Sequence, residues 1–373
     1  MKWLPWLPVF IFGIIFMIIT HELGHFFAAK TVGIKVEQFS IGFGPEIVGW
    51  DRGETRYSIK WFLAGGSVKI LGMNPEEEIS EEDRPRSYTE AAYWRRAVVV
   101  LAGSFVHILI ALFLFYLFFW PIGYQVPTGR VGKVEKTVEV STGKKVPSPA
   151  YQAGLQKGDL IVEVNAVPVH EWADLTDQLS SQPGKEVDLK VKRDHNVLGF
   201  KARLLDVDGR GILGIEVNVK DAFTRRSNPL SAAWEALKTT GQVTVLLAKG
   251  VGSLFSVKTL KMLVGITPRT QESPRSIIGA AQLTYQAAGQ NASVFIFILA
   301  QLFLFLALFN LIPFPPFDGG HLLVIIVEKI TGREIDMRKL MPVAWVVVIL
   351  LTIVALRLAV LDVINPLKNP FAP

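Results

Sequence analysis

The sequence of 373 residues contains no cysteine. That absence excludes disulfide bonds, thiolate metal sites and a cysteine nucleophile, although it does not identify a cellular compartment. The chain also lacks a nucleic-acid-binding motif, because its basic residues are scattered rather than clustered, and nucleic acid is not an expected partner. Internal repeats and low-complexity tracts are absent as well. Because cysteine is absent, any metal site must draw on histidine and carboxylate ligands.

Charge is nearly absent from four long segments. Half of all residues are hydrophobic and the mean hydropathy is +0.36, which is unusual for a soluble domain. An α-helix needs about 20 apolar residues to cross the hydrocarbon core of a membrane. The sequence therefore predicts a multi-pass α-helical membrane protein with about four transmembrane helices. The predicted spans cover residues 3–20, 97–122, 292–317 and 340–356.

Lysine and arginine are concentrated in two loops, over residues 30–96 and 329–339. Loops with this composition stay on the cytoplasmic side of a membrane, so we expect both of them there. The long stretch between the second and third spans is then extracytoplasmic, in an inner-membrane protein. The net charge of +6 is interpreted as a result of this topology and of contact with anionic lipids, which makes membrane lipids an expected partner.

The first span runs into the motif "THELGH", residues 20–25. His21 and His25 are four residues apart, so a helix places both rings on one face, as two zinc ligands require. Glu22 projects beside them, where a general base would act on an attacking water. A signal peptide would be the alternative for this segment, but cleavage near Ala28–Ala29 would remove both histidines. Ionisable groups inside a membrane are costly and usually functional, which favours a metal site over a chance pair of histidines.

A catalytic zinc ion takes three protein ligands and keeps one open position. The metzincin pattern does not supply the third ligand, because Thr31 occupies the position of its third histidine. A candidate lies in "NLIPFPPFDGGHLL", residues 310–323, whose prolines forbid a continuous helix. Asp318 in this segment would complete a His-His-Asp site, unless it only caps the next helix in a surface turn. His321 is a competing ligand, and His107 in the second span is expected to serve packing or hydrogen bonding.

Together, the two motifs resemble those of the site-2 protease family of intramembrane zinc metalloproteases. The resemblance covers nearly the whole chain. More narrowly, the chain resembles the bacterial regulator-of-sigma-E branch, in a version with one PDZ domain. It implies a Zn²⁺ cofactor held by His21, His25 and Asp318, with Glu22 as the catalytic base. It also implies that the Asn310 side-chain amide binds the unwound backbone of the substrate. Many relatives have a small-residue motif ending in asparagine in the second span, whereas this chain has "GSFVH", residues 103–107.

The cytoplasmic loop contains an alternating, aromatic-rich segment over residues 46–71, around a turn-like sequence at residues 51–54. This pattern predicts two or three short strands. The family resemblance implies a membrane-associated β-hairpin beside the zinc ion. A free strand edge there would pair with an extended substrate. A small sheet that only touches lipid headgroups is the alternative, and the acidic residues that follow, 72–88, are expected to form an exposed linker.

The extracytoplasmic stretch contains a segment that resembles the core of a PDZ domain, an α+β fold. The resemblance predicts a short helix ending at Gly154, a turn at residues 157–159 and a strand ending at Asn165. A helix over residues 171–182 and a hairpin turning at residues 194–196 should follow. A peptide ligand is a potential partner of such a domain, although domains of this kind in the family act more as gates for bulky substrates. The alternative is a spacer without a ligand.

The predicted organisation has four parts. They are an N-terminal membrane part over 1–126, a PDZ domain over 127–218, an amphipathic extracytoplasmic helical region over 219–291 and a C-terminal membrane part over 292–373. We expect an intramembrane zinc metalloprotease that hydrolyses single-span membrane proteins, such as an anti-sigma factor or a remnant signal peptide. A membrane zinc transporter or sensor and a noncatalytic PDZ scaffold are the alternative functions. A zinc protease that acts on soluble substrates is a further variant.

Overall fold

The computed structural model describes residues 7–74, 77–139, 145–254, 256–270, 273–288 and 291–367. The chain divides into two compact units. Unit 1 comprises Met1–Pro121 and Asn228–Ala372, and unit 2 comprises Ile122–Ser227. Unit 1 therefore contains both sequence motifs, and the segment expected to form a PDZ domain lies within unit 2.

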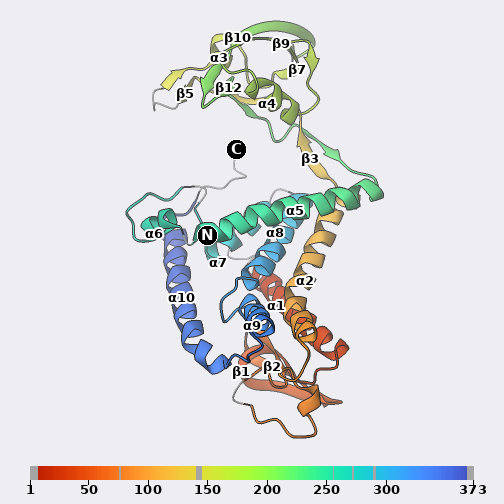
Figure 1. The fold of residues 1–373 in the computed structure, drawn as a ribbon. Coiled ribbons are helices and arrows are strands. Elements are labelled where there is room, and N and C mark those ends of the chain that lie inside the picture. Colours follow the sequence, from red (N-terminus) through yellow and green to blue (C-terminus); the bar gives the residue numbers. More distant parts are fainter. Residues whose placement is uncertain are drawn as a thin grey trace. The chain divides into compact units, whose positions relative to one another are not determined.

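Unit 1 is mainly helical (Figure 1). Its helices in the described part of the chain are α1 (Leu7–Thr31), η2 (Arg84–Arg86), α2 (Tyr93–Leu117), α5 (Pro229–Leu254), α6 (Val257–Leu263), α7 (Ile277–Ala288), α8 (Ala292–Asn310), α9 (Asp318–Thr331), η4 (Met337–Leu340) and α10 (Met341–Ile364), and η3 (Phe118–Ile122) continues α2 into unit 2. Four helical segments among the described residues are long and apolar enough to cross a membrane, which confirms the four predicted spans. These segments are Ile11–Thr31, Tyr93–Ile122, Ala292–Asn310 and Met337–Ile364.

The third span is shorter than predicted, because α8 ends at Asn310 rather than near Phe317. Pro313, Pro315 and Pro316 follow, and proline removes a backbone donor and clashes with the preceding helical turn. The chain instead forms a tight loop and starts α9 at Asp318. The first span is longer than predicted, since α1 continues through the histidine motif to Thr31. These two differences in helix length lie at the two sequence motifs that contain the candidate metal ligands.

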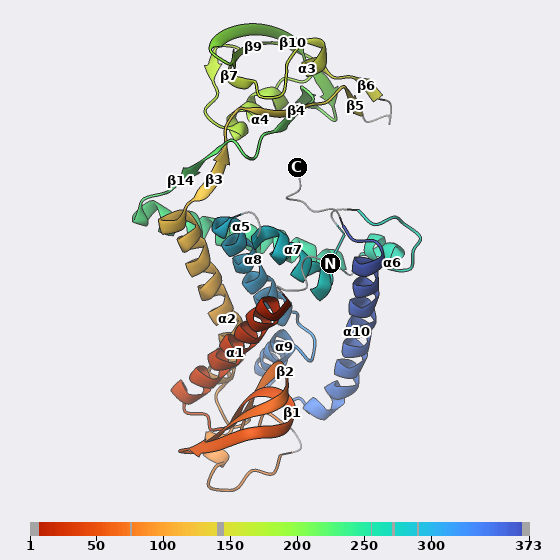
Figure 2. The ribbon, with the colours of Figure 1, turned by 180° about the vertical axis from the view of Figure 1, so that it is seen from behind.

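The cytoplasmic loop forms two long strands, β1 (Val36–Arg52) and β2 (Thr55–Ile70), which turn at Gly53. Strand β1 starts ten residues earlier than predicted. Residues 38–41 have Cα partners both in 66–69 and in 56–59 of β2, so the hairpin folds back on itself. The Ser40 and Ser58 hydroxyls are 2.9 Å apart and link the two paired segments of β1 and β2 at this fold. Figure 2 shows this hairpin beneath α1 and α9, and it is thereby close to both motifs.

Helix α5 runs across the ends of α2 and α8 in both ribbon views (Figures 1 and 2). Ala236 and Val243 on one face are buried against Phe115 and Phe303 of those helices. Leu230 and Trp234 on another face are exposed, so α5 is amphipathic. A bent pair of α5 and α6 also passes the length and composition test for one membrane span, with a bend of 59°. The crosswise direction of α5 favours the predicted amphipathic surface helix over a fifth span.

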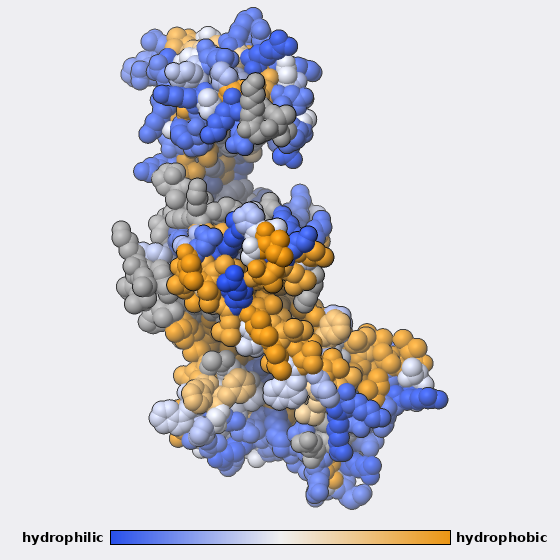
Figure 3. Space-filling model, turned by 90° about the vertical axis from the view of Figure 1, so that its left-hand side faces the viewer, coloured by the Kyte–Doolittle hydropathy of each residue, from blue (hydrophilic) through white to orange (hydrophobic). Residues whose placement is uncertain are grey.

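Hydrophobic residues gather over the helices of unit 1 on the face drawn in Figure 3, whereas the surface of unit 2 there is mainly hydrophilic. Phe12, Phe105 and Phe113 are among the exposed aromatic side chains of α1 and α2. An apolar surface of this extent is unstable in water and stable in lipid. Unit 1 is accordingly the membrane part of the protein.

Unit 2 is an α+β unit. Its elements are β3 (Tyr124–Pro127), β4 (Val131–Val134), β5 (Thr137–Glu139), β6 (Lys145–Pro147), α3 (Pro149–Gln152), β7 (Leu160–Val164), β8 (Val167–Pro168), α4 (Trp172–Ser180), β9 (Glu186–Arg193), β10 (Asn196–Arg203), β11 (Leu205–Val207), β12 (Arg210–Ile212), β13 (Ile215–Val217) and β14 (Ala222–Arg225). The largest sheet has the order β10-β9-β7-β8. The short helix, the strand before Asn165, the following helix and the hairpin turn near Asp194 lie where the sequence predicts them. Strands β3 and β14 pair with each other, so the unit extends beyond residues 127–218 at both ends.

A buried carboxylate stabilises the turn before β7. Asp159 is 1% exposed and accepts two hydrogen bonds from the Arg193 guanidinium, at 2.7 and 2.8 Å, and one from the Gln156 N–H at 2.8 Å. Burial by itself would raise the pKa of the Asp159 carboxyl, but these hydrogen bonds outweigh it and hold the pKa below its ordinary value. The ionised carboxylate is therefore the form that stabilises the fold.

Replacing Asp159 with asparagine is expected to lower the stability of unit 2 by about 1.5–3 kcal/mol, as loss of hydrogen bonds to a charged group does. Because the folded-state pKa is depressed, this contribution is complete above the unfolded pKa of about 3.9 and is lost as the pH falls through the folded value. Hydrogen exchange of the β7 and β9 amides in the full chain measures both effects. Asp188→Asn, at an exposed position of β9, is the control, and an equal effect of both variants would contradict the prediction.

Candidate metal centre

Helix α1 carries both histidines of the first motif into the interior of unit 1. His21 is 8% exposed and His25 is 9% exposed. Their Nε2 atoms are 3.1 Å apart, because a separation of four residues stacks two side chains on one helix face. The two rings thus present two nitrogen atoms to one point.

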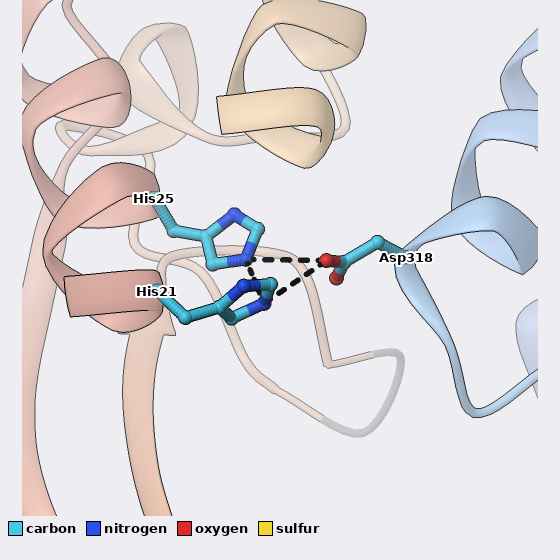
Figure 4. A group of neighbouring side chains, drawn as sticks. All are labelled: His21, His25 and Asp318. Atoms are coloured by element: carbon cyan, nitrogen blue, oxygen red, sulfur yellow. Dashed lines mark hydrogen bonds and ion pairs between the residues drawn. The ribbon is translucent and has the colours of Figure 1, made fainter. Parts of the chain in front are cut away.

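Asp318 reaches the same point from the first turn of α9. Its Oδ2 atom lies 3.1 Å from His21 Nε2 and 3.4 Å from His25 Nε2 (Figure 4). These three residues form a group that could hold a metal ion. The sequence motifs are almost 300 residues apart, and the fold brings them together as predicted.

The loop before Asp318 owes its compactness to two glycines. A Cβ on Gly319 would lie 2.3 Å from the Leu311 carbonyl oxygen, and a Cβ on Gly320 would lie 2.5 Å from the Pro315 nitrogen. Any larger side chain would push the loop away from the first turn of α9. Glycine at both positions therefore allows the chain to turn from α8 into α9 and to direct Asp318 back towards α1.

The geometry of the three residues fits zinc. Zinc bonds of about 2.0–2.1 Å in a tetrahedral site place neighbouring ligand atoms about 3.3 Å apart, close to the three observed separations. The His25 Nδ1 atom lies 2.8 Å from the Val99 carbonyl oxygen and donates to it, which leaves Nε2 free to bind a metal. Asp318 Oδ2 is buried and has no hydrogen-bond partner within the described chain, so a cation would satisfy it.

Glu22 lies next to the histidines and faces the β-hairpin. Strand β2 passes directly beside its side chain. A Cβ on Gly66 would lie 2.9 Å from Glu22 Cγ, so glycine is needed where β2 passes this side chain. The arrangement places a carboxylate beside the three candidate ligands without making it part of their group. The side chains of the three candidate ligands are only 11–18% exposed.

The second span contributes directly to the site, although the sequence did not specify how. A Cβ on Gly103 of α2 would lie 2.5 Å from His21 Cε1 and 2.5 Å from His25 Nε2. The rings therefore pack directly on this glycine, and Val99 of the same helix holds His25. A small residue within an otherwise bulky apolar span was the available signal, since small residues mark close helix contacts in membranes.

Three further polar residues, Asn310, His107 and His321, are candidates for roles in or near the site. Asn310 Nδ2 lies 3.4 Å from His21 Nε2, at the edge of the site. His107 Nε2 lies 2.8 Å from the Met17 carbonyl oxygen, in agreement with the predicted hydrogen-bonding role. His321 lies outside the group of His21, His25 and Asp318 and lines a different cavity, together with Arg96 and Glu328.

Comparisons with known proteins identify the family of the chain. The chain matches the model of Peptidase family M50 over residues 9–354. It is 30% identical over 407 aligned residues to the zinc metalloprotease Rip1 of Mycobacterium tuberculosis, with 99% of each chain covered. Rip1 of Mycolicibacterium smegmatis is 30% identical over 397 residues, which cover 96% of this chain and 97% of that protein. A relative from Clostridium acetobutylicum is 30% identical over 365 residues, which cover 97% and 98%.

Proposed function

Because this chain belongs to peptidase family M50 and is a zinc metallopeptidase of the site-2 protease type, we propose that it hydrolyses peptide bonds in or near the transmembrane segment of single-span membrane proteins. The observation that carries this proposal is the convergence of His21, His25 and Asp318 beside Glu22, at the end of a membrane-spanning helix. A site at this depth is reached most readily by a substrate that is itself in the membrane.

In this proposal, His21, His25 and Asp318 hold the zinc ion. When bound, zinc supplies Lewis acidity, which lowers the pKa of an attacking water from ~16 towards ~7 and stabilises negative charge on the scissile carbonyl. Glu22 accepts the proton that the water loses during its attack. The protonated Glu22 then donates that proton to the leaving amine, so one residue serves as base and as acid.

The substrate must be extended at the point of cleavage, because a helix hides its backbone amides. The position of the hairpin supports a role in this step, since Gly66 of β2 lies directly against Glu22. We propose that the substrate adds to this sheet as a further strand. The Asn310 amide, at the edge of the site, binds the unwound substrate backbone.

The proposal also specifies the cellular location of the protein and its orientation in the membrane. The zinc site and the hairpin are on the cytoplasmic side of the inner membrane, because their loops are rich in lysine and arginine. Unit 2 follows the far end of α2 in the chain and is therefore extracytoplasmic. We propose that unit 2 is a PDZ domain that limits the access of substrates with large outer domains, and that the substrate is an anti-sigma factor or a remnant signal peptide.

Removal of zinc is expected to stop cleavage of a single-span substrate completely. The purified full-length protein is reconstituted with a panel of such substrates, with and without a zinc chelator. Cleavage sites mapped by mass spectrometry are expected within or next to the transmembrane segment. Re-addition of zinc should restore activity.

The controls separate the proposal from its alternatives. Cleavage sites found only in soluble domains would contradict intramembrane proteolysis and favour a protease that is merely anchored in the membrane. Zinc that crosses the bilayer of sealed vesicles without cleavage of any substrate would favour a transporter. A purified protein without zinc would favour a PDZ scaffold.

A further inference from the structure

A buried ion pair links the helix that carries Asp318 to the helix that contacts the histidines. Glu328 lies on α9, ten residues after Asp318, and Arg96 lies in the first turn of α2. Arg96 Nη1 and Glu328 Oε2 are 2.8 Å apart, and the two side chains are only 11% and 5% exposed. The pair thus joins α2 and α9 in the interior of unit 1.

Further contacts fix both partners. Glu328 Oε1 accepts a hydrogen bond from the Ile335 N–H at 2.9 Å, which ties the chain beyond α9 to the pair. The Arg96 guanidinium lies over the Tyr88 ring, 4.8 Å from its centroid. Tyr88 belongs to the segment between β2 and α2, so the pair also holds the end of the hairpin. A cavity of about 120 Å³ lies beside these side chains and His321.

The pair is too far from the zinc site to take part in chemistry. Ten residues correspond to about 15 Å along a helix. A buried ion pair is also a weak source of stability, because well-packed apolar residues of similar volume often stabilise as well or better. Stability alone therefore does not account for an ion pair at this buried position. The contacts around the pair indicate a role in positioning the two helices.

Apolar side chains of α9 and α2 also pack together near this point. Ile325 of α9 packs in one buried cluster with Val99 and Val100 of α2. Apolar contacts are non-directional and resist a small axial shift only weakly. The ion pair, by contrast, requires Arg96 Nη1 and Glu328 Oε2 to stay 2.8 Å apart while Oε1 accepts from the Ile335 N–H, and this selects one position of α9 along α2.

Arg96 and Val99 are three residues apart, so they share a face of α2, and the Val99 carbonyl orients His25. We propose that Arg96 and Glu328 are positioning residues, which fix α9 along α2 so that Asp318 reaches both imidazoles. Metal sites tolerate displacements of only about 0.5 Å in their ligands. This inference rests on the proposed zinc site. It holds that contacts about three helical turns away determine how accurately the zinc ligands are placed.

The double variant R96M/E328M tests the proposal, because two methionines keep the volume of the pair and leave no buried charge. We expect its thermal midpoint to stay within a few degrees of the wild type. Its zinc affinity, measured by competition with a chromophoric chelator, should fall at least about tenfold, as for other supporting contacts of metal ligands. The kcat for a single-span substrate should fall, with little change in KM.

The partly exposed pair Lys30–Glu54, which joins α1 to the turn between β1 and β2, gives the matched control K30M/E54M, for which we expect unchanged zinc affinity. Wild-type zinc affinity in R96M/E328M would overturn the proposal. If that variant does not fold, R96K decides: it keeps the charge without the forked geometry, so reduced zinc affinity at an unchanged thermal midpoint supports the proposal and unchanged affinity overturns it. The zinc titration needs no substrate, so failure to cleave membrane substrates would count against the proposed function alone.

Discussion

Replacement of Glu22 by glutamine is expected to abolish proteolysis while the protein keeps its zinc. Glutamine has the shape of glutamate and fits the same space beside Gly66 of β2. It cannot take a proton from the attacking water or return one to the leaving amine. General acid–base catalysis contributes about 10²–10⁴-fold per step, so we expect activity to fall by at least about 10³-fold.

Two measurements on the same preparation are needed, namely the cleavage rate of a single-span substrate and the zinc content per chain. Glu81→Gln is the matched control, because that side chain is 96% exposed in the segment between β2 and α2 and should change neither value. Loss of zinc together with activity would make Glu22 a ligand or a structural support. Retention of more than about a tenth of the activity would exclude it as the catalytic base.

The same variant distinguishes the functional classes. A zinc transporter or sensor that uses His21, His25 and Asp318 should keep its function in Glu22→Gln, because its ligands are intact. A noncatalytic scaffold should be indifferent to the substitution and should bind no zinc. Only a hydrolase is expected to lose its function while it keeps its metal.

The sequence predicted the parts of the site that depend on local chemistry. The four-residue separation of His21 and His25 determines their shared helix face. The prolines over residues 313–316 indicated a break in the helix, although the predicted span ran on to residue 317 and α8 ends at Asn310. Asp318 was identified because a carboxylate follows this break at the end of a span. The elements of unit 2 were also predicted, since turn residues and alternating strands are local signals.

The sequence did not reveal contacts between distant elements. The packing of Gly103 against both rings and the hydrogen bond from His25 to Val99 depend on the relative position of α1 and α2. The fold-back of β1 between two parts of β2 likewise depends on pairing that no alternation pattern specifies. The sequence also left Asp318 and His321 as competing ligands. In the fold, Asp318 Oδ2 lies within 3.4 Å of both imidazoles, whereas His321 lies outside that group.

Substitution of Gly103 by alanine is expected to damage the zinc site more than any other single-methyl change in α2. The added Cβ would lie 2.5 Å from the ligand atom His25 Nε2 and 2.5 Å from His21 Cε1, which is closer than real atoms approach. The His25 ring cannot move away without losing its hydrogen bond to Val99. Zinc affinity should therefore fall about 10–100-fold, and cleavage should fall by at least about 10²-fold.

Alanine favours helix over glycine by about 1 kcal/mol, so a weaker intrinsic helix cannot explain such a loss. Gly13→Ala in α1 is the matched control, because a Cβ there meets nothing within 4 Å, and it should leave zinc affinity and cleavage unchanged. Zinc competition, cleavage and thermal unfolding are measured for both variants. Wild-type zinc affinity in Gly103→Ala would mean that α2 does not press against the imidazole rings, and the contribution of the second span to the metal centre would then be wrong.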